Sequence, residues 1–231
     1  MTWGEKIEDR YFKEVRTSED KYILQFLNRY GEDSLIDFLE VGSGMGRFAS
    51  IISPKKNYRL ICIEINKDNA KQLAEEGIKV KAESILDNTI EDNKFDIVHC
   101  SHVIEHFGYS EVTVLLDELC RVAKDGGIII IRTPLPSPKF YFDIDHVRPY
   151  PAQAILSYYR NSQQQKVGRY DIGFVGMKLR RQAYVPFPYS LSPAGVFFNR
   201  LCMFLWTKCR FPFSSPNGYT LIFRKNGTKR I

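Results

Sequence analysis

The chain has 231 residues, a hydrophobic content of 44% and a formal net charge of +6. This composition is ordinary for one globular domain with an appended subdomain, and no internal repeat is present. No apolar run reaches the length of a membrane span, and the first six residues lack the apolar core of a signal peptide. The five cysteines have no Cys-x-x-Cys spacing, so we expect reduced, buried thiols and a cytoplasmic protein.

The first distinctive segment is an apolar run over residues 35–41, which predicts a buried strand. Three glycines spaced two apart follow it: Gly42, Gly44 and Gly46. They predict a tight turn into a helix from about Arg47, whose free N–H groups face a ligand. Glu40 lies just before the turn, where its carboxylate would repel a pyrophosphate and attract a cationic group.

Two more strands are predicted next. The apolar run 58–63 ends in Glu64, at a strand tip where a carboxylate can accept hydrogen bonds from both ribose hydroxyls. Asn66 is a suitable N-cap for a helix that Gly77 ends. Residues 78–82 form the third short strand, followed by Glu83 and Ser84.

The alternation of strands and helices continues. Residues 94–100 are the fourth apolar run, and Ser110 is the predicted N-cap of an amphipathic helix that extends to about Lys124. A turn at residues 125–127 leads into four consecutive isoleucines, 128–131, the fifth strand.

The C-terminal part supplies the last predicted elements. A sixth strand is expected over about 181–187, a helix over 192–208 and a seventh strand over about 219–224. Strands that alternate with helices predict an α/β fold, a doubly wound, Rossmann-like and mainly parallel seven-stranded sheet with helices on both faces. We place the catalytic core and an N-terminal helical cap in residues 1–150, and the completion of the sheet with a basic insertion in residues 151–231.

The pattern Gly-x-Gly-x-Gly with a preceding acid resembles motif I of the class I S-adenosylmethionine-dependent methyltransferases. Residues 119–127 are similar to that family's Arg-Val-Leu-Lys-Pro-Gly-Gly signature, with Ala123 and Asp125 as departures. The resemblance covers roughly residues 30–150 and implies S-adenosylmethionine as cofactor. It places these residues in the cofactor site: Glu40, Gly42, Ser43, Gly44, Gly46, Glu64, Ile65, Glu83, Ser84, Ile85 and Ser101. In the family, the acid after the third strand accepts from the adenine amino group.

A possible metal site follows the fourth strand. On one helix face, His102, Glu105 and His106 fall at i, i+3 and i+4, a spacing suited to a divalent metal. The segment is similar to the Glu-x-x-Glu-His of small-RNA 2′-O-methyltransferases, where it holds a metal, and of ubiquinone-pathway O-methyltransferases. Because His102 stands where those enzymes have Glu, the metal is an alternative and not the expectation.

The candidate catalytic base is His146, in the segment Asp-His-Val-Arg-Pro-Tyr-Pro after the fifth strand. This segment resembles one found in saccharide methyltransferases, whose histidine lies near the acceptor hydroxyl. His146 would take the hydroxyl proton, with Asp143 or Asp145 orienting its ring, and His106 is the second candidate. The alternative is a histidine that only holds the loop or caps a helix.

Charge is unevenly distributed along the chain. Residues 151–231 hold 13 Lys and Arg, a single acid, and 15 of the 31 aromatic residues. Such a segment favours an anionic partner: RNA, a phosphate-linked saccharide or an anionic membrane surface. The apolar helical pattern over 192–208 suits a helix that lies in a membrane interface, which would place the protein peripherally on the inner membrane. It suits equally a helix that packs on the core or on a second copy of the chain.

Three functions therefore compete. The first is O-methylation of a saccharide or another small or lipid-linked hydroxyl acceptor, which the His146 segment favours. The second is metal-dependent RNA 2′-O-methylation, which the basic C-terminal segment favours. The third is a non-catalytic, cofactor-binding partner subunit, against which the intact Glu40, Glu64 and glycines argue.

Overall fold

The computed structural model describes residues 2–30, 34–160, 168–188, 190–210 and 214–228. Its strands are β1 (Ile36–Val41), β2 (Tyr58–Ile63), β3 (Val80–Lys81), β4 (Phe95–Ser101), β5 (Ala123–Pro134), β6 (Tyr170–Ala183) and β7 (Ser214–Thr228). Its α-helices are α1 (Trp3–Tyr30), α2 (Ala49–Ile52), α3 (Lys67–Glu75), α4 (Tyr109–Val122), α5 (Ala152–Tyr159) and α6 (Pro193–Cys209), with 3-10 turns η1 (Ile104–His106) and η2 (Pro138–Phe142).

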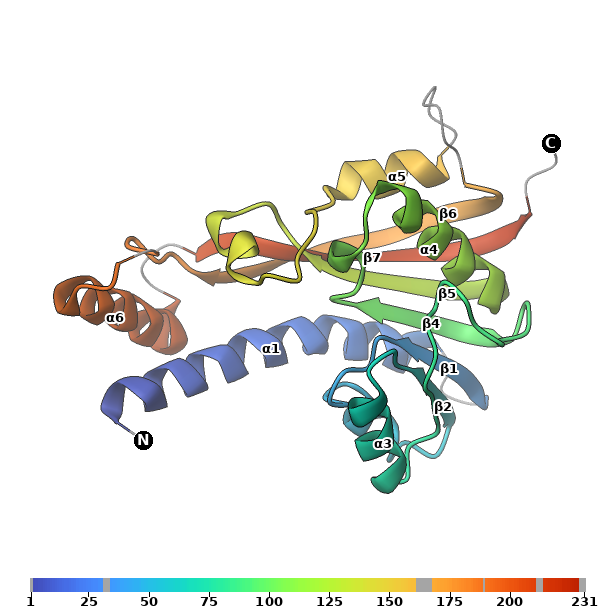
Figure 1. The fold of residues 1–231 in the computed structure, drawn as a ribbon, viewed down its shortest axis with the longest axis horizontal. Helices are drawn as coiled ribbons and strands as arrows, with labels where there is room; N and C mark the ends of the chain where they lie inside the picture. Colours follow the sequence, from blue (N-terminus) through green and yellow to red (C-terminus); the bar gives the residue numbers. More distant parts are fainter. Residues whose placement is uncertain (1, 31–33, 161–167, 189, 211–213, 229–231) are drawn as a thin grey trace.

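The strands form one sheet in the order β3-β2-β1-β4-β5-β7-β6 (Figure 1). The pairs among β1 to β5 are parallel, whereas β7 runs antiparallel to both β5 and β6. The expected α/β class and the seven-stranded, mainly parallel sheet are confirmed. The carboxyl ends of β1, β2, β4 and β5 meet at one edge, where ligands bind in open α/β sheets.

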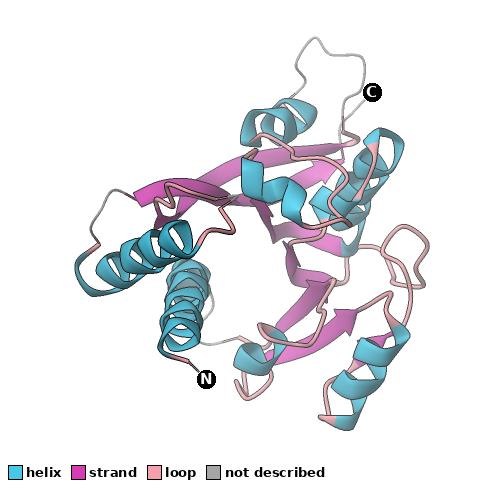
Figure 2. Ribbon diagram, turned by 60° about the vertical axis from the view of Figure 1, so that its left-hand side comes forward, coloured by secondary structure: helices cyan, strands magenta, loops and turns pink. Residues whose placement is uncertain are grey.

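Both faces of the sheet are covered by helices (Figure 2). The isoleucine run of β5 contacts helices on both faces. Ile129 and Ile131 pack in the cluster that contains residues of α4 and α5, and Ile128 and Ile130 pack in the cluster that contains residues of α1. A strand buried on both sides needs apolar residues at every position, so the run lacks the polar alternation of a half-exposed strand.

The two ends of the chain pack together. α1 and α6 lie side by side, and Tyr11 of α1 contacts Trp206 of α6 with ring centroids 5.5 Å apart (Figure 1). The basic C-terminal segment also pairs with α1 carboxylates, Arg200 with Glu8 at 3.0 Å and Arg210 with Glu14. Part of its positive charge is therefore compensated within the chain.

Several local predictions are confirmed. Asn66 caps α3 by accepting from the backbone N–H groups of Asp68 and Asn69, as predicted. A helix lies where one was expected over 192–208, and the structure adds that Ser192 caps it by accepting from Gly195. Each cap satisfies a backbone donor that has no partner within its helix.

Several local predictions are wrong. The N-cap of α4 is Gly108 and not Ser110, and residues 125–127, expected as a turn, lie within β5. The sixth strand is β6, Tyr170–Ala183, and starts eleven residues earlier than expected, because its pairing with β7 and not its own apolar pattern determines its extent. The helix after the glycine turn is the short α2 and begins at Ala49. His102, Glu105 and His106 do not share one helix, because His102 has a φ of 56° and only Ile104–His106 form a 3-10 turn.

Candidate functional site

The glycine turn lies at the carboxyl end of β1 and has left-handed backbone at all three glycines, with φ of 67° at Gly42, 52° at Gly44 and 77° at Gly46. A Cβ at Gly42 would overlap Val103, and one at Gly46 would overlap Leu73. A Cβ at Gly44 would meet nothing within 4 Å, so Gly44 faces open space. Two of the glycines therefore serve packing and backbone conformation, and the middle one leaves room for a ligand.

This difference gives a test of the ligand site. We expect Gly44→Ala to weaken binding of S-adenosylhomocysteine at least about tenfold, because the added methyl group enters the space that the glycine leaves open. Gly126→Ala is the matched control: its φ is 81° and its Cβ would also meet nothing within 4 Å. Both variants should lose about 1–2 kcal/mol of stability from the left-handed backbone. Titration calorimetry and thermal unfolding separate the two effects, and equal loss of affinity in both variants would contradict the assignment.

Glu40, the predicted partner of the cofactor's amino-acid part, is buried near the end of β1. Its Oε2 lies 2.9 Å from Nδ1 of His99, the residue beside it in β4. The His99 ring is fully buried, packs 4.4 Å from the Phe48 ring and has no partner for Nε2 among the described residues. His99 therefore fixes the orientation of the Glu40 carboxylate. Sequence analysis missed this histidine, although a polar residue within an apolar strand was the available signal.

Glu64, the predicted ribose ligand, lies just beyond β2 and is 6% exposed. Its Oε2 accepts from the Gly44 N–H at 2.6 Å, and its Oε1 accepts from the Asn66 N–H at 2.9 Å. A carboxylate has about four acceptor sites, so two remain for ribose hydroxyls. The neighbouring Ile65 is 72% exposed, as is Met45 in the glycine turn. The site thus presents a fixed carboxylate, and two exposed apolar side chains lie in the segments that hold it.

The predicted cofactor residues after β3 are less available to a ligand, because they already have partners within the protein. Glu83 accepts from the Thr89 hydroxyl at 3.1 Å and pairs with Lys81 at 3.6 Å. Ser84 Oγ accepts from the Leu86 N–H, and the Ile85 side chain is buried in the core. A contact of Glu83 with the adenine amino group stays a prediction. Ser43, also assigned to the cofactor, is buried within the glycine turn.

The segment after β4 brings together residues from distant parts of the chain. Ser101 is the last residue of β4, and the Nδ1 of His102 lies 3.0 Å from Oε1 of Glu105. The other ring nitrogen of His102 lies 3.1 Å from Nη1 of Arg180 in β6. Thr133 of β5 donates to the second Glu105 oxygen at 3.1 Å. Both oxygens of this buried carboxylate are therefore already hydrogen-bonded.

The two candidate catalytic histidines lie together. The rings of His106 and His146 are 5.1 Å apart, and each has one ligand atom in a cluster with Glu105 in which all such atoms lie within 4.8 Å of one another. The metal ligands predicted from sequence were His102, Glu105 and His106. In the structure His146 takes the place of His102 in this cluster.

Backbone carbonyls orient both rings. His146 Nδ1 lies 2.7 Å from the Phe140 carbonyl oxygen, and His106 Nδ1 lies 2.9 Å from that of Asp145. A carbonyl only accepts, so each Nδ1 carries the proton and each Nε2 keeps its lone pair in the neutral ring. The Phe140 carbonyl thus contacts Nδ1 of His146, where an Asp143 or Asp145 carboxylate was expected to orient the ring. The Asp143 carboxylate lies 3.7 Å from His146 Nε2, on the other side of the ring.

A buried ion network supports this edge from the α1 side. Arg132 at the carboxyl half of β5 is fully buried, and it pairs with Glu19 at 3.1 Å and Asp20 at 2.9 Å. Arg180 also pairs with Glu19, and Arg47 beside the glycine turn pairs with Asp20. The network therefore joins α1 to β5, β6 and the glycine turn.

These features fit S-adenosylmethionine. The space at Gly44 admits a ligand against the backbone, Glu64 offers acceptors for ribose hydroxyls, and the exposed Ile65 offers an apolar surface for a purine. The sulfonium methyl of this cofactor is already activated for transfer. The residues of the chain would bind it and align it with an acceptor at the same edge.

Comparison with known proteins agrees with this geometry. Residues 39–131 match the family described as a methyltransferase domain. The uncharacterized protein MJ0638 of Methanocaldococcus jannaschii is 32% identical over 95 residues, which are 41% of this chain. The match spans only 40% of that relative.

Two solved structures share the fold. A SAM-dependent methyltransferase from Archaeoglobus fulgidus superimposes with a TM-score of 0.60 at 22% identity, over 90% of this chain and 94% of its own. The N-methyltransferase NodS from Bradyrhizobium japonicum WM9, solved with S-adenosyl-L-homocysteine, gives 0.61 at 13% identity, over 91% and 87%. The family match, the glycine turn and the fold together identify residues 39–131 as a class I S-adenosylmethionine-dependent methyltransferase domain, with S-adenosylmethionine as its cofactor.

Proposed function

We propose that this chain transfers the methyl group of S-adenosylmethionine to a hydroxyl oxygen of a saccharide or another small or lipid-linked acceptor. The observation that carries the proposal is the orientation of His146: the Phe140 carbonyl holds Nδ1, so the lone pair is on Nε2, with the Asp143 carboxylate 3.7 Å from that atom. A hydroxyl must lose its proton as its oxygen attacks the methyl carbon, and a neutral imidazole is suited to accept that proton. The methyl carbon leaves sulfur as it bonds to oxygen, which yields S-adenosylhomocysteine and the methyl ether.

Alignment of the two reactants supplies most of the remaining rate. In this proposal Glu64 and the glycine turn hold the nucleoside. His99 orients Glu40 toward the cationic group that it is predicted to bind. The acceptor binds beside His146 and His106. The exposed phenylalanines of α6 (Phe197, Phe198 and Phe204) suit an acceptor carried on a lipid. Among the described residues, no helix is both long enough and apolar enough to cross a membrane.

The test is transfer of radiolabelled methyl from S-adenosylmethionine into a lysate of the source cells, fractionated into lipid, polysaccharide, RNA, protein and small molecules. Base-resistant label in the lipid, saccharide or small-molecule fraction supports the proposal. Label in RNA supports the second function. No label, with S-adenosylhomocysteine binding intact, supports a cofactor-binding partner subunit.

The second candidate is metal-dependent 2′-O-methylation of RNA, which the cluster of Glu105, His106 and His146 favours. The Nε2 atoms of the two histidines and the Glu105 carboxylate would hold a divalent cation, which would lower the pKa of a bound hydroxyl. The donor types fit, but both Glu105 oxygens already accept hydrogen bonds inside the protein. We therefore keep His146 as a base in the leading proposal.

This choice predicts that methyl transfer survives removal of divalent metals. After dialysis against EDTA we expect the transfer rate to change less than about twofold, since proton transfer to an imidazole needs no Lewis acid. The rate is measured before dialysis, after it, and after addition of Mn²⁺ or Mg²⁺. Loss of transfer that the metal restores, together with abolished metal binding in Glu105→Gln, would favour the RNA candidate.

A further inference from the structure

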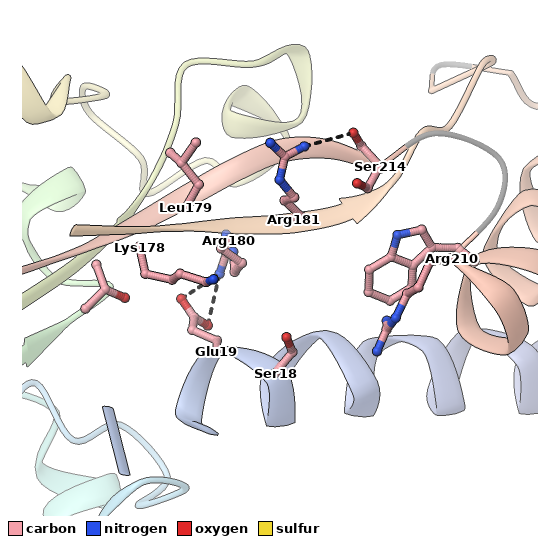
Figure 3. Close-up of a pocket in the computed structure, with 10 residues that line it drawn as sticks. Ser18, Glu19, Lys178, Leu179, Arg180, Arg181, Arg210 and Ser214 are labelled. Carbon is pink, nitrogen blue, oxygen red and sulfur yellow. Dashed lines mark hydrogen bonds and ion pairs between the residues drawn. The ribbon is translucent and has the colours of Figure 1, made fainter. Parts of the chain in front are cut away.

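A pocket of about 310 Å³ lies between α1, the β6–β7 pair and the end of α6 (Figure 3). Its lining includes Ser18, Glu19, Lys178, Arg180, Trp206 and Arg210. Figure 3 shows Lys178 and Arg180 extending from β6 toward α1, while Leu179 and Arg181 point to the other side of the strand. The size is at the lower end of small-molecule pockets, which begin at about 300 Å³.

The side chains that face this pocket carry an excess of positive charge. Glu19 is the acid among the residues that line it, and that carboxylate already pairs with Arg180 at 3.3 Å and with Arg132 at 3.1 Å. Arg210 pairs with the half-exposed Glu14 on the rim. Lys178 has no ion pair within the described part of the chain, so its ammonium group is available to an anion.

The pocket also contains a buried donor that lacks an acceptor. The side chain of Trp206 is 3% exposed, and its indole N–H has no hydrogen-bond partner among the residues described. An indole nitrogen only donates, and burial without an acceptor is unfavourable. The Arg210 guanidinium lies 4.2 Å from the centre of the same ring. A negatively charged ligand would pair with this guanidinium, beside the indole ring.

The pocket is connected to the edge where transfer takes place. Arg180 lies in its wall, and Nη1 of Arg180 is 3.1 Å from Nε2 of His102, which follows the last residue of β4. A molecule that places an anionic group in the pocket therefore lies beside Arg180, whose guanidinium contacts the residue that follows β4.

We propose that this pocket binds the phosphate or pyrophosphate group of the methyl acceptor. A phosphate presents three oxygens and up to two charges, which matches two cations from different elements, Lys178 of β6 and Arg210 at the end of α6. That the bound molecule is the methyl acceptor rests on the proposed function. That the pocket binds an anionic group rests on the pocket alone. It assigns the acceptor to the phosphorylated saccharides or their lipid-linked forms.

The test uses Trp206 as its own reporter. The chain has two tryptophans, and Trp3 is 62% exposed, so Trp3→Phe leaves Trp206 as the single tryptophan, which is excited selectively over the tyrosines at long wavelength. We expect inorganic pyrophosphate, titrated at constant ionic strength, to change its emission saturably. Lys178→Gln in this background should weaken binding about tenfold, as loss of a charge-assisted hydrogen bond does. Lys208→Gln is the matched control, because Lys208 lies on α6 outside the lining of this pocket and should leave binding unchanged.

The outcomes separate this inference from the proposed function. No saturable binding, or equal weakening by both lysine variants, overturns the pocket assignment even where S-adenosylhomocysteine binding and methyl transfer are intact. Lys178-dependent binding supports the site whether or not any lysate fraction takes up label, and the lack of label then counts against methyl transfer alone. A competition experiment with vesicles of phosphatidylcholine and phosphatidic acid shows whether the natural phosphate group is carried by a lipid. Displacement of bound pyrophosphate by the vesicles supports a lipid-borne phosphate, and no displacement supports a soluble phosphate ester.

Discussion

Replacing His146 with alanine should lower the rate of methyl transfer by about 10²- to 10⁴-fold, the usual contribution of a positioned general base. The ring is partly buried, and its contact with the Phe140 carbonyl fixes which nitrogen carries the proton. Single-turnover transfer with labelled S-adenosylmethionine into the active lysate fraction measures the chemical step. Binding of S-adenosylhomocysteine should stay within about twofold, because none of the nucleoside contacts involves this loop.

His106→Ala is the matched control for that experiment. Its ring lies 5.1 Å from that of His146, and it is held in the same way by the Asp145 carbonyl. We expect a smaller loss, from misplacement of the acceptor, because His106 is the second candidate. Full activity of His146→Ala would eliminate His146 as the base, and a selective loss in His106→Ala would transfer the role to His106.

The largest effect on stability is expected for Glu19→Gln. Glu19 is buried against the fully buried Arg132, and its replacement by a neutral amide leaves that guanidinium with Asp20 as its remaining anion. Breaking a buried ion pair costs about 3–5 kcal/mol, and the lower end applies because Asp20 stays in place. Glu14→Gln, on the same helix and paired with Arg210 at the surface, should cost at most about 1 kcal/mol. Urea unfolding at neutral pH measures both, and equal effects would contradict the prediction.

The pH dependence of the same variant has a definite sign. Burial acts to raise the pKa of Glu19, but His102, Arg132 and Arg180 together lower it well below the ordinary value. A carboxyl whose pKa is lower in the folded state stabilises the fold above its unfolded pKa, about 4.3, and loses that contribution as the pH falls further. The difference in unfolding free energy between the wild type and Glu19→Gln should therefore shrink below about pH 4.3.

The sequence determined the parts of this protein that depend on neighbouring residues. Apolar runs of strand length, the caps at Asn66 and Ser192, and the three glycines after Glu40 specify the local elements and the cofactor turn. Since each parallel strand needs a long return connection, the alternation of such elements leads to an α/β sheet. The continuous isoleucine run of β5 was predicted as a strand, and the structure buries it on both faces.

Only the tertiary structure decided how the acceptor side is assembled. Arg132 meets Asp20 across 112 residues, and His106 meets His146 through two loops after different strands. No periodicity relates such pairs, because the register of the sheet and the path of the loops bring them together. The extent of β6 was missed for the same reason, since its partner β7 follows it by a whole helix and sets where pairing begins. The cationic pocket beside Trp206 likewise exists only where α1, β6 and α6 converge.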